Sequence, residues 1–447
     1  MALFQPKVKP VNRIGNSHWL APWEQDAVIR ALIESDADLV KCDNGRNLPL
    51  KSGGKTDIYM NLRNARNDPK IIALFTELYA NPLSRLKVKR FGEVPDAVSC
   101  FAGPLSLKMN IPFTTIREQP KEGRVSKASV IGRLVRGERF ALVDDVVTDG
   151  ASKIAPARTC IAADVDLGPL VVLVDRQQGW LKKFGDEGLN LEVWSGMTLH
   201  DVRKFLISRG VMERCRKEVE TKNPIIVALD GKPWSEVLPI ADQLRTTGCI
   251  LKVNDLLFWE GYRELIPDLQ VYGRVMVDLK GHDIPNTLDN IAKRFATNPP
   301  WAVTVHASGG EAMIKAVVKA FEGTPTKVLT ITVLTSMDAA NSEEVYSRQP
   351  LEQVRKLAAI ASRAGAHGLV CSPEEVATLK AEYPKLELIT PGVRSPGAAQ
   401  GDQARIGTPQ ATLALGASFL VMGRQILGAV DPVAEVQRLL KEEVKVS

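Results

Sequence analysis

Short apolar runs alternate with amphipathic stretches through the carboxyl-terminal half of the chain, from about residue 223 onward. The amphipathic stretches, such as residues 350–366, have helical periodicity. Alternating strands and helices imply a parallel sheet, and eight such units within about 225 residues match a closed (β/α)8 TIM barrel. The eight runs, rich in branched aliphatic residues, cover residues 225–230, 249–254, 275–280, 302–307, 328–336, 368–372, 386–392 and 419–424.

The amino-terminal half has fewer alternating units, although it is also α/β in pattern. Strand-like runs at residues 97–101, 140–147 and 170–176 predict an open parallel sheet. A charged segment, Arg214–Pro224, separates the amino-terminal pattern from the carboxyl-terminal one. We therefore expect one domain over residues 1–213 and a second over residues 223–447.

The overall composition is that of an ordinary soluble globular protein, with 447 residues, 45% hydrophobic and 25% charged. The formal charge of +6 suits anionic small molecules, but basic residues are too dispersed to predict nucleic-acid binding. No window approaches the ~20 apolar residues of a membrane helix, and MALFQPKVKP lacks the apolar core of a signal peptide. Six scattered cysteines form no CxxC pair, which favours free thiols in the cytoplasm.

Charged residues gather at the ends of the predicted barrel strands, where the chemistry of such barrels takes place. Residues two apart on a strand point to the same side, so Asp278 and Lys280 should project together into the barrel mouth. Lys252, ending the second run, and Asp283, in the following loop, can extend them into an alternating array of charge. A lone D-x-K pair would more often be a structural salt bridge.

The residues around this array resemble the orotidine 5′-monophosphate decarboxylase family, in the right order along the whole carboxyl-terminal half. The segment DLKGHDIPNT is the most specific match. The resemblance implies a barrel enzyme of pyrimidine biosynthesis that converts orotidine 5′-monophosphate to uridine 5′-monophosphate without a cofactor. A related sugar-phosphate enzyme with the same D-x-K-x-x-D core is an alternative that the other matches disfavour. The matching positions are Asp230, Lys252 and residues 278–287, 333–336, 391–394, 401–405 and 423–424.

The resemblance also implies roles for the charged residues. Lys280 would stabilise the carbanion left at C6 of the pyrimidine and then protonate it. Ionised Asp278 would stand beside the departing carboxylate. Lys252 and Asp283 would hold that pair and contact the ribose hydroxyls. These four residues are the expected catalytic set.

Binding residues follow from the same resemblance. Ser336 would contact the pyrimidine, while Gln403, the Gly423 amide and Arg424 would bind the phosphate. Residues 396–400 would belong to a lid. Asp283 and Thr287 would reach the neighbouring subunit's site, so the resemblance implies a homodimer through the barrel. The full expected substrate-binding set is Asp230, Ile284, Thr287, Ser336, Pro391, Gln403, Gly423 and Arg424.

Two histidines near the array, His282 and His306, could suggest a metal site. They lie on different predicted strands without a clear acidic third ligand. Histidines in that setting are more often structural, and we expect no metal here.

The amino-terminal half carries a second resemblance. FALVDDVVTDGASK, residues 140–153, is an apolar strand, two acids and a small-residue turn into a helix, which can bind ribose hydroxyls and a 5′-phosphate. It is similar to the phosphoribosyl-pyrophosphate loop of type I phosphoribosyltransferases. Residues 50–63 and 174–179 resemble orotate phosphoribosyltransferases in particular. The implied site residues are Lys51, Tyr59, Arg117, Lys121, Asp144, Asp145, Thr148, Gly150, Ser152 and Arg176.

This half departs from the transferase pattern where pyrophosphate would leave. Glu93 replaces a glycine, Glu118 replaces a lysine, and Gly123 stands where a histidine is usual. Cations in that loop neutralise the leaving group, so we expect transferase activity to be weak or absent. The chain thus looks like a fusion of the uridine monophosphate synthase type. The alternatives are a fully bifunctional synthase, with Mg²⁺ accompanying phosphoribosyl pyrophosphate, and a non-catalytic amino-terminal module that builds a higher homo-oligomer.

Overall fold

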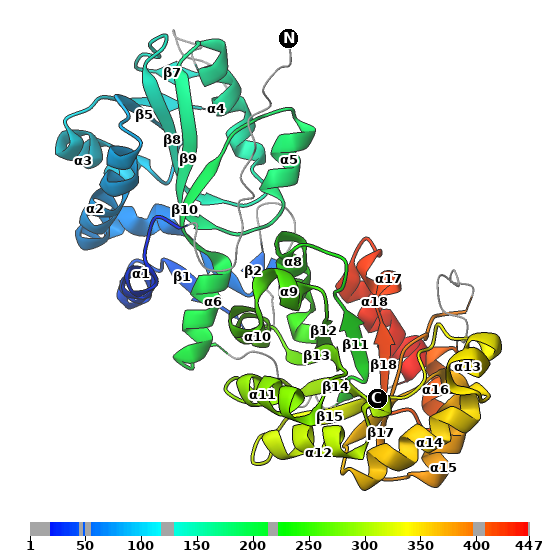
Figure 1. Cartoon of the computed structure of the whole chain (residues 1–447). Helices are drawn as coiled ribbons and strands as arrows, with labels where there is room; N and C mark the ends of the chain where they lie inside the picture. Colours follow the sequence, from blue (N-terminus) through cyan, green and yellow to red (C-terminus); the bar gives the residue numbers. More distant parts are fainter. Residues whose placement is uncertain are drawn as a thin grey trace, which may run out of the picture. The chain divides into compact units, whose positions relative to one another are not determined.

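The computed structural model describes residues 18–43, 48–49, 55–117, 129–212, 222–396 and 407–445. The chain divides into two compact units, Met1–Glu213 and Arg214–Ser447 (Figure 1). Most of the charged segment expected between the two domains, residues 213–221, lies outside the described residues.

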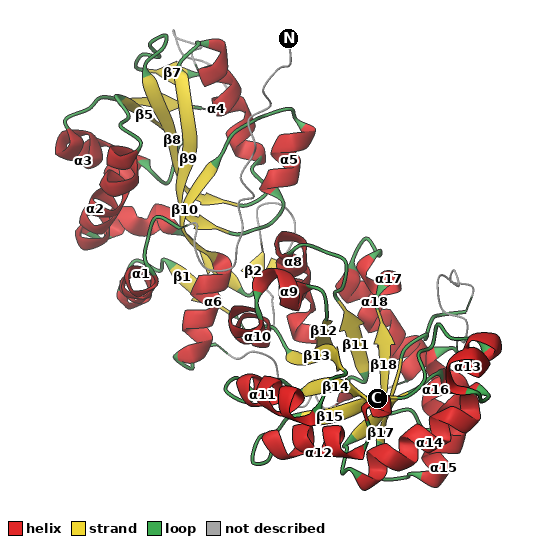
Figure 2. Ribbon diagram, viewed as in Figure 1, coloured by secondary structure: helices red, strands yellow, loops and turns green. Residues whose placement is uncertain are grey.

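The carboxyl-terminal unit is a closed barrel of eight parallel strands, in which β18 pairs with β11 (Figure 2). Each predicted run coincides with one strand, so the predicted barrel is confirmed. One buried side chain from each of six strands fills the interior, among them Ile226, Met276 and Leu329. The strands are β11 (Ile225–Ala228), β12 (Ile250–Val253), β13 (Arg274–Gly281), β14 (Ala302–His306), β15 (Lys327–Ile331), β16 (Gly368–Val370), β17 (Glu387–Thr390) and β18 (Phe419–Met422).

Amphipathic helices surround this barrel. In α14, Val354, Leu357, Ala358 and Ala361 recur at helical spacing and are buried, and Pro350 begins the helix at a position where its missing N–H costs nothing. The helices of this unit are α8 (Trp234–Leu244), α9 (Leu256–Glu260), α10 (Tyr262–Gln270), α11 (Pro285–Phe295), α12 (Glu311–Ala320), α13 (Ala339–Tyr346), α14 (Pro350–Arg363), α15 (Val376–Glu382), α16 (Pro409–Ala414), α17 (Arg424–Leu427) and α18 (Pro432–Arg438), with single turns η2 (Arg245–Thr247), η3 (Ala307–Gly309) and η4 (Pro373–Glu375) and a terminal π-helix, η5 (Leu439–Val444).

One barrel strand is interrupted by a bulge. Val277 of β13 pairs with Val303 of β14, but the next pair is Gly281 with Val305. Four steps along β13 therefore match two steps along β14. Within the bulge, Lys280 has a φ of 51°, the left-handed conformation that side chains other than glycine rarely adopt. The sequence predicted that Asp278 and Lys280 point to the same side of a regular strand. The strand is instead irregular between them, because Lys280 lies within the bulge.

The amino-terminal unit contains a six-stranded open sheet in the order β10-β9-β8-β5-β6-β7. All neighbours are parallel except the edge strand β7, which runs antiparallel to β6, so the expected open sheet is present with a mixed edge. Alternate residues of β8 enter two separate cores: Ala141 and Val143 enter one, Phe140 and Leu142 the other. Both faces of the sheet are thus covered, as its apolar strands require.

Helices flank this sheet, and two small antiparallel pairs, β1 with β4 and β2 with β3, complete the unit. The sheet strands are β5 (Arg90–Glu93), β6 (Phe113–Ile116), β7 (Val130–Ile131), β8 (Arg139–Val147), β9 (Asp166–Asp175) and β10 (Val193–Thr198). The remaining elements are α1 (Pro22–Glu34), β1 (Val40–Cys42), β2 (Leu48–Pro49), β3 (Lys55–Thr56), β4 (Ile58–Met60), η1 (Leu62–Asn67), α2 (Pro69–Arg85), α3 (Ser99–Met109), α4 (Ala151–Ala162), α5 (Trp180–Asp186) and α6 (Leu199–Ser208).

The strand predicted at residues 97–101 is wrong, because this stretch enters helix α3. Phe101, Ala102 and Leu105 are buried at helical spacing, and the helix ends at Asn110 in a left-handed conformation. A five-residue apolar run is too short for its periodicity to distinguish a strand from the first turn of a helix.

Two further observations concern the chain as a whole. Within the described ranges, no helix combines the length and apolar character needed to cross a membrane. Among the described residues no disulfide joins the cysteines, which are Cys42, Cys100, Cys160, Cys249 and Cys371.

Candidate active site

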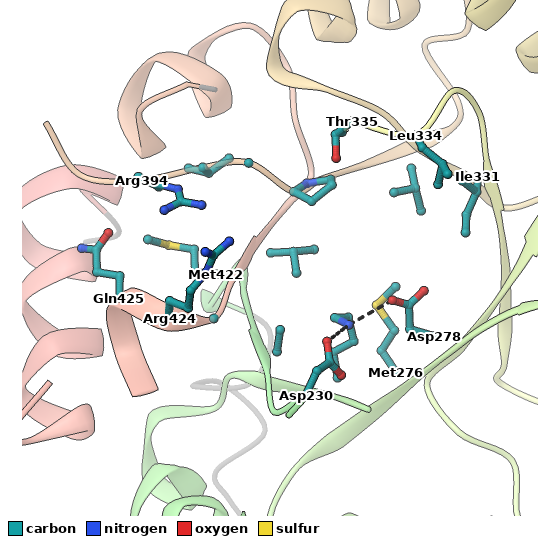
Figure 3. A pocket seen from close by; sticks show the side chains of 18 of the residues that line it. Asp230, Met276, Asp278, Ile331, Leu334, Thr335, Arg394, Met422, Arg424 and Gln425 are labelled. Atoms are coloured by element: carbon teal, nitrogen blue, oxygen red, sulfur yellow. Dashed lines mark hydrogen bonds and ion pairs between the residues drawn. The ribbon is translucent and has the colours of Figure 1, made fainter. Parts of the chain in front are cut away.

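The carboxyl ends of β11, β12 and β13 bring four charged side chains into contact. The Nζ atom of Lys252 lies 2.5 Å from Oδ2 of Asp230 and 2.9 Å from Oδ2 of Asp278, contacts that are dashed in Figure 3. The Nζ atom of Lys280 lies 2.6 Å from the same Asp278 oxygen. The structure thus assembles an alternating acid–base–acid–base array from residues far apart in the sequence.

Burial makes this array electrostatically strong. The side chains of Lys252 and Asp278 are 8% and 10% exposed, whereas that of Lys280 is 40% exposed. Burial alone would lower the pKa of Lys252, but the Asp278 and Asp230 carboxylates outweigh it and the pKa is raised. Burial likewise opposes ionisation of Asp278, yet Lys252 and Lys280 hold the pKa of that carboxyl below its usual value. Lys252 and Asp278 are therefore both charged at neutral pH.

The array borders a pocket of about 790 Å³ at the barrel mouth. Figure 3 shows Asp230 and Asp278 at one side of this pocket and Arg394 and Arg424 at another. Apolar residues, including Leu334, border the space as well. Such a cavity suits a ligand with a reactive polar group, an apolar face and an anionic end.

Seven of the expected barrel residues line the pocket: Asp230, Lys252, Asp278, Lys280, Pro391, Gly423 and Arg424. Asp283 and Ile284 are exposed outside it, and Thr287 is half-buried. Ser336 is exposed and does not line it, whereas its neighbour Thr335 does. Gln403 and residues 397–400 of the expected lid lie outside the described residues.

Three residues at the site were given no role from the sequence. Arg394, in the loop after β17, gives the pocket a second guanidinium. Thr304 of β14 donates a hydrogen bond to Oδ1 of Asp278 over 2.9 Å, and the Asn254 side chain donates to the Asp278 carbonyl over 2.6 Å. The available signals were an arginine ending the matched segment 391–394 and a threonine between two valines in the apolar run AVTVHA.

The two histidines lie close together at the same end of the barrel, with ring centroids 5.6 Å apart. Burial, with smaller effects from His282 and Lys280, lowers the pKa of His306. Within the part of the chain that the structure describes, no group of three or more histidine, cysteine, aspartate and glutamate side chains could hold a metal ion.

In the amino-terminal unit, the two expected ribose-binding acids end strand β8. Asp144 is buried and paired with Lys153, and its backbone carbonyl accepts a hydrogen bond from the Tyr79 hydroxyl over 2.7 Å. Burial, followed by the charge of Asp144, raises the pKa of Asp145 to about 8.

The turn after β8, expected to be a phosphate loop, contains a glycine in a left-handed conformation. Gly150 has a φ of 77°, and a Cβ there would lie 2.5 Å from the Phe184 ring, so glycine is required on both counts. Thr148 and Ser152, on either side of this glycine, are half-buried. The Asp149 carboxylate already accepts a hydrogen bond from the Ala151 amide over 3.1 Å.

The other residues expected at the transferase-like site include Arg176, which follows β9 and was expected to face orotate. The Arg176 guanidinium is buried and donates to the Thr56 hydroxyl over 3.1 Å and to the Ile58 carbonyl over 3.4 Å. Tyr59 is half-buried next to Ile58. Arg117 is half-buried beyond β6. Lys51 and Lys121 lie outside the described residues, as do Glu118 and Gly123.

Glu93, the departure in the pyrophosphate-side turn, is buried at the end of β5 with 5% of its surface exposed. One carboxylate oxygen accepts a hydrogen bond from the Thr115 hydroxyl, and the other has no hydrogen-bond partner among the described residues. The glutamate thus places a carboxyl group inside this unit with one oxygen lacking a hydrogen bond among the described residues, and burying such an oxygen is costly.

Comparison with known proteins points to one family for the barrel unit. Residues 223–439 match the model described as "Orotidine 5′-phosphate decarboxylase / HUMPS family". An orotidine 5′-phosphate decarboxylase of Pseudomonas aeruginosa (strain LESB58) is 42% identical over 226 residues, which are 49% of this chain and 97% of that protein.

Solved structures show weaker overall similarity. The crystal structure of an orotidine 5′-phosphate decarboxylase from Lactobacillus acidophilus has a TM-score of 0.44 and 35% identity, covering 49% of this chain and 98% of that one. A Leishmania donovani UMP synthase structure has a TM-score of 0.35 and 27% identity, covering 42% and 39%. On the sequence match, which spans nearly the whole Pseudomonas protein, this chain belongs to the orotidine 5′-phosphate decarboxylase / HUMPS family.

Proposed function

We propose that the barrel unit converts orotidine 5′-monophosphate to uridine 5′-monophosphate. The contact between Lys280 and Asp278, at the edge of a pocket with two arginines elsewhere on its wall, carries the proposal. The direct test is to incubate the purified protein with orotidine 5′-monophosphate and follow uridine 5′-monophosphate and CO₂. A properly folded protein that forms neither product would contradict the proposal.

The chemistry follows from the charge array. Breaking the bond between C6 and the carboxylate releases CO₂ and leaves the electron pair on C6. The Lys280 ammonium stabilises this developing charge and then donates its proton to C6, recovering another from solvent. Ionised Asp278 lies beside the substrate carboxylate, and its repulsion is relieved as CO₂ leaves. The lysine supplies the positive charge, so the proposal requires no cofactor or metal.

The two arginines suit the 5′-phosphate. Arg394 and Arg424 line the pocket from the loops after β17 and β18, where barrels often bind phosphate. Guanidinium groups match the geometry of phosphate oxygens. We place the phosphate between them and the pyrimidine beside Asp278 and Lys280, which fixes the reacting carbon against the array.

Arg394→Ala and Arg424→Ala should each raise KM for orotidine 5′-monophosphate by about 10- to 100-fold, because each removes a charge-assisted contact with the phosphate. Steady-state kinetics with this substrate and with orotidine, which lacks the phosphate, measure the effect. The variants should match wild type on orotidine. Arg363→Ala, at an exposed arginine of α14, is the control. Equal losses on both substrates would show that the arginines do not act on the phosphate.

We also propose that the barrel functions as a homodimer. Asp283 and Ile284 are exposed next to the array yet outside the pocket of their own chain, and Ile284 is 65% exposed. Their exposure leaves them available to a second copy, and the resemblance to the decarboxylase family places the residues at positions 283 and 287 at a neighbouring subunit's site. In that arrangement, Asp283 and Thr287 would complete the partner's site.

For the amino-terminal unit we infer a phosphoribosyltransferase-like domain with weak or no transferase activity. The β8 acids and the Gly150 turn support ribose-phosphate binding. The buried Glu93 carboxylate disfavours a pyrophosphate leaving group, because like charges repel strongly away from water. If the unit is active, Mg²⁺ would accompany phosphoribosyl pyrophosphate. If it is not, assembly into a larger homo-oligomer is its alternative role.

Restoring the transferase family's residues at positions 93, 118 and 123 should raise transferase activity. Wild-type turnover of orotate with phosphoribosyl pyrophosphate and Mg²⁺ should fall below about 1 s⁻¹, the lower end for typical enzymes. Glu93→Gly combined with Glu118→Lys and Gly123→His should increase it at least about tenfold, because it removes two acids and adds cations around the leaving pyrophosphate. Orotate consumption measures both.

The matched control is Glu34→Lys with Asp36→Gly, which makes the same formal charge change at exposed positions of the same unit. It should leave turnover at the wild-type level. Robust wild-type turnover would instead identify the chain as a working bifunctional synthase.

A further inference from the structure

The bulge in β13 leaves a backbone amide without its usual sheet partner. Val303 and Val305 of β14 pair with Val277 and Gly281, so Thr304 lies opposite the bulged residues. Its side chain takes over the missing interaction, because the Lys280 amide donates to the Thr304 hydroxyl over 2.9 Å. A side chain thus replaces one hydrogen bond of the barrel ladder.

The same hydroxyl also binds the acid of the array. Thr304 Oγ1 donates to Oδ1 of Asp278 over 2.9 Å, while Oδ2 of that carboxylate is taken by the two lysines. A hydroxyl has one proton, so a group that accepts from Lys280 and donates to Asp278 has both directions fixed. It therefore connects the backbone of the proton donor with the side chain of the neighbouring acid.

Thr304 itself does not reach the substrate. It is completely buried and does not line the pocket. On the other side of the bulge, Asn254 holds the Asp278 carbonyl. The two neighbouring strands thus hold the bulge from both sides, one at the backbone of Asp278 and one at its carboxylate.

We propose that Thr304 is a positioning residue for decarboxylation, whose hydroxyl fixes the Asp278 carboxylate and the Lys280 backbone in the geometry that the reaction needs. This inference rests on the proposed function of the barrel. The left-handed conformation of Lys280 makes the device necessary, because that conformation persists only where its surroundings impose it. Without the hydroxyl, the Lys280 amide loses its contact with β14 and the ammonium moves relative to C6.

Thr304→Val removes the hydroxyl and keeps the shape of the side chain. We expect kcat to fall about 100-fold, because misplacing a reacting group by about 1 Å has a cost of that order. KM should change less than about threefold, since phosphate binding lies elsewhere in the pocket. Thr304→Ser restores the hydroxyl and should recover kcat to within about threefold of wild type.

The matched control is Thr330→Val on the adjacent strand β15. Thr330 is equally buried, and its hydroxyl donates to the Gly368 carbonyl over 3.3 Å rather than to the array. It should lose stability with little loss of kcat. If Thr304→Val does not fold, Thr304→Ala against Thr330→Ala makes the same comparison.

Hydrogen exchange of the peptide that contains Lys280, measured on the whole chain by mass spectrometry, tests whether the Thr304 hydroxyl holds the Lys280 backbone, and it does so without relying on activity. Exchange should rise in Thr304→Val and return to the wild-type rate in Thr304→Ser. A kcat of Thr304→Val within threefold of Thr330→Val, or a serine variant as impaired as the valine variant, would overturn the proposal. An inactive wild-type protein with the expected exchange pattern would instead refute the decarboxylase function, while the structural role of the Thr304 hydroxyl would remain supported.

Discussion

Lys280→Ala is expected to lower kcat/KM for orotidine 5′-monophosphate by more than about 10⁴-fold, because it removes both the cation that stabilises the carbanion and the acid that protonates it. The barrel should still fold. Asp278 keeps its contacts with Lys252 and Thr304, so no buried carboxylate is left without a partner. Alanine also meets the same backbone conformation that lysine already tolerates at this position.

Steady-state kinetics and thermal unfolding of the same preparation measure the two halves of this prediction. Lys293→Ala is the control, since Lys293 is a 63% exposed lysine of α11 that pairs only with nearby Asp289 among the described residues. It should retain wild-type activity. Near-normal turnover in folded Lys280→Ala protein would rule out the proposed mechanism.

Mixing two inactive variants should restore activity if the site is shared between subunits. In a heterodimer of Lys280→Ala with Asp283→Asn, both lesions fall in one site and the other site is intact. With equal amounts and random exchange of subunits, about one quarter of the wild-type activity should return, since half of the dimers are hybrids and each has one working site of two. Activity before and after subunit exchange is the measurement.

A second mixture provides the control. Lys280→Ala with Asp278→Asn damages two residues that touch within one chain, so both sites of their heterodimer stay defective. This mixture should show no recovery. Demonstrated heterodimers of the first pair without any gain in activity would mean that each site is built from a single chain.

The barrel was predictable because its signal is repeated eight times. Each buried parallel strand is a short aliphatic run, and the regular alternation with helices compensates for the ambiguity of any one run. Residues 97–101 had no such repetition to support them and were assigned wrongly. The neighbouring strand β5 was missed because its four residues, RFGE, include two charged side chains.

The members of the array were predictable from their places at strand ends, but their geometry was not. Alternation along a strand predicted that Asp278 and Lys280 would lie side by side, and they do, yet through a bulge with a shifted register. Pairing register depends on two strands at once, which no local pattern encodes. For the same reason Thr304 could not be assigned, since its role exists only opposite the bulge.

The left-handed backbone at Lys280 makes thermal stability and catalytic turnover favour different residues at this position. A residue with a Cβ pays about 1 kcal/mol for a left-handed conformation, which glycine adopts freely. A laboratory evolution campaign that screens only for heat resistance would therefore gain by replacing this lysine with glycine, and would discard the proton donor in doing so. Screens on this scaffold need an activity filter at every round, because this stabilising change lies at the centre of its proposed chemistry.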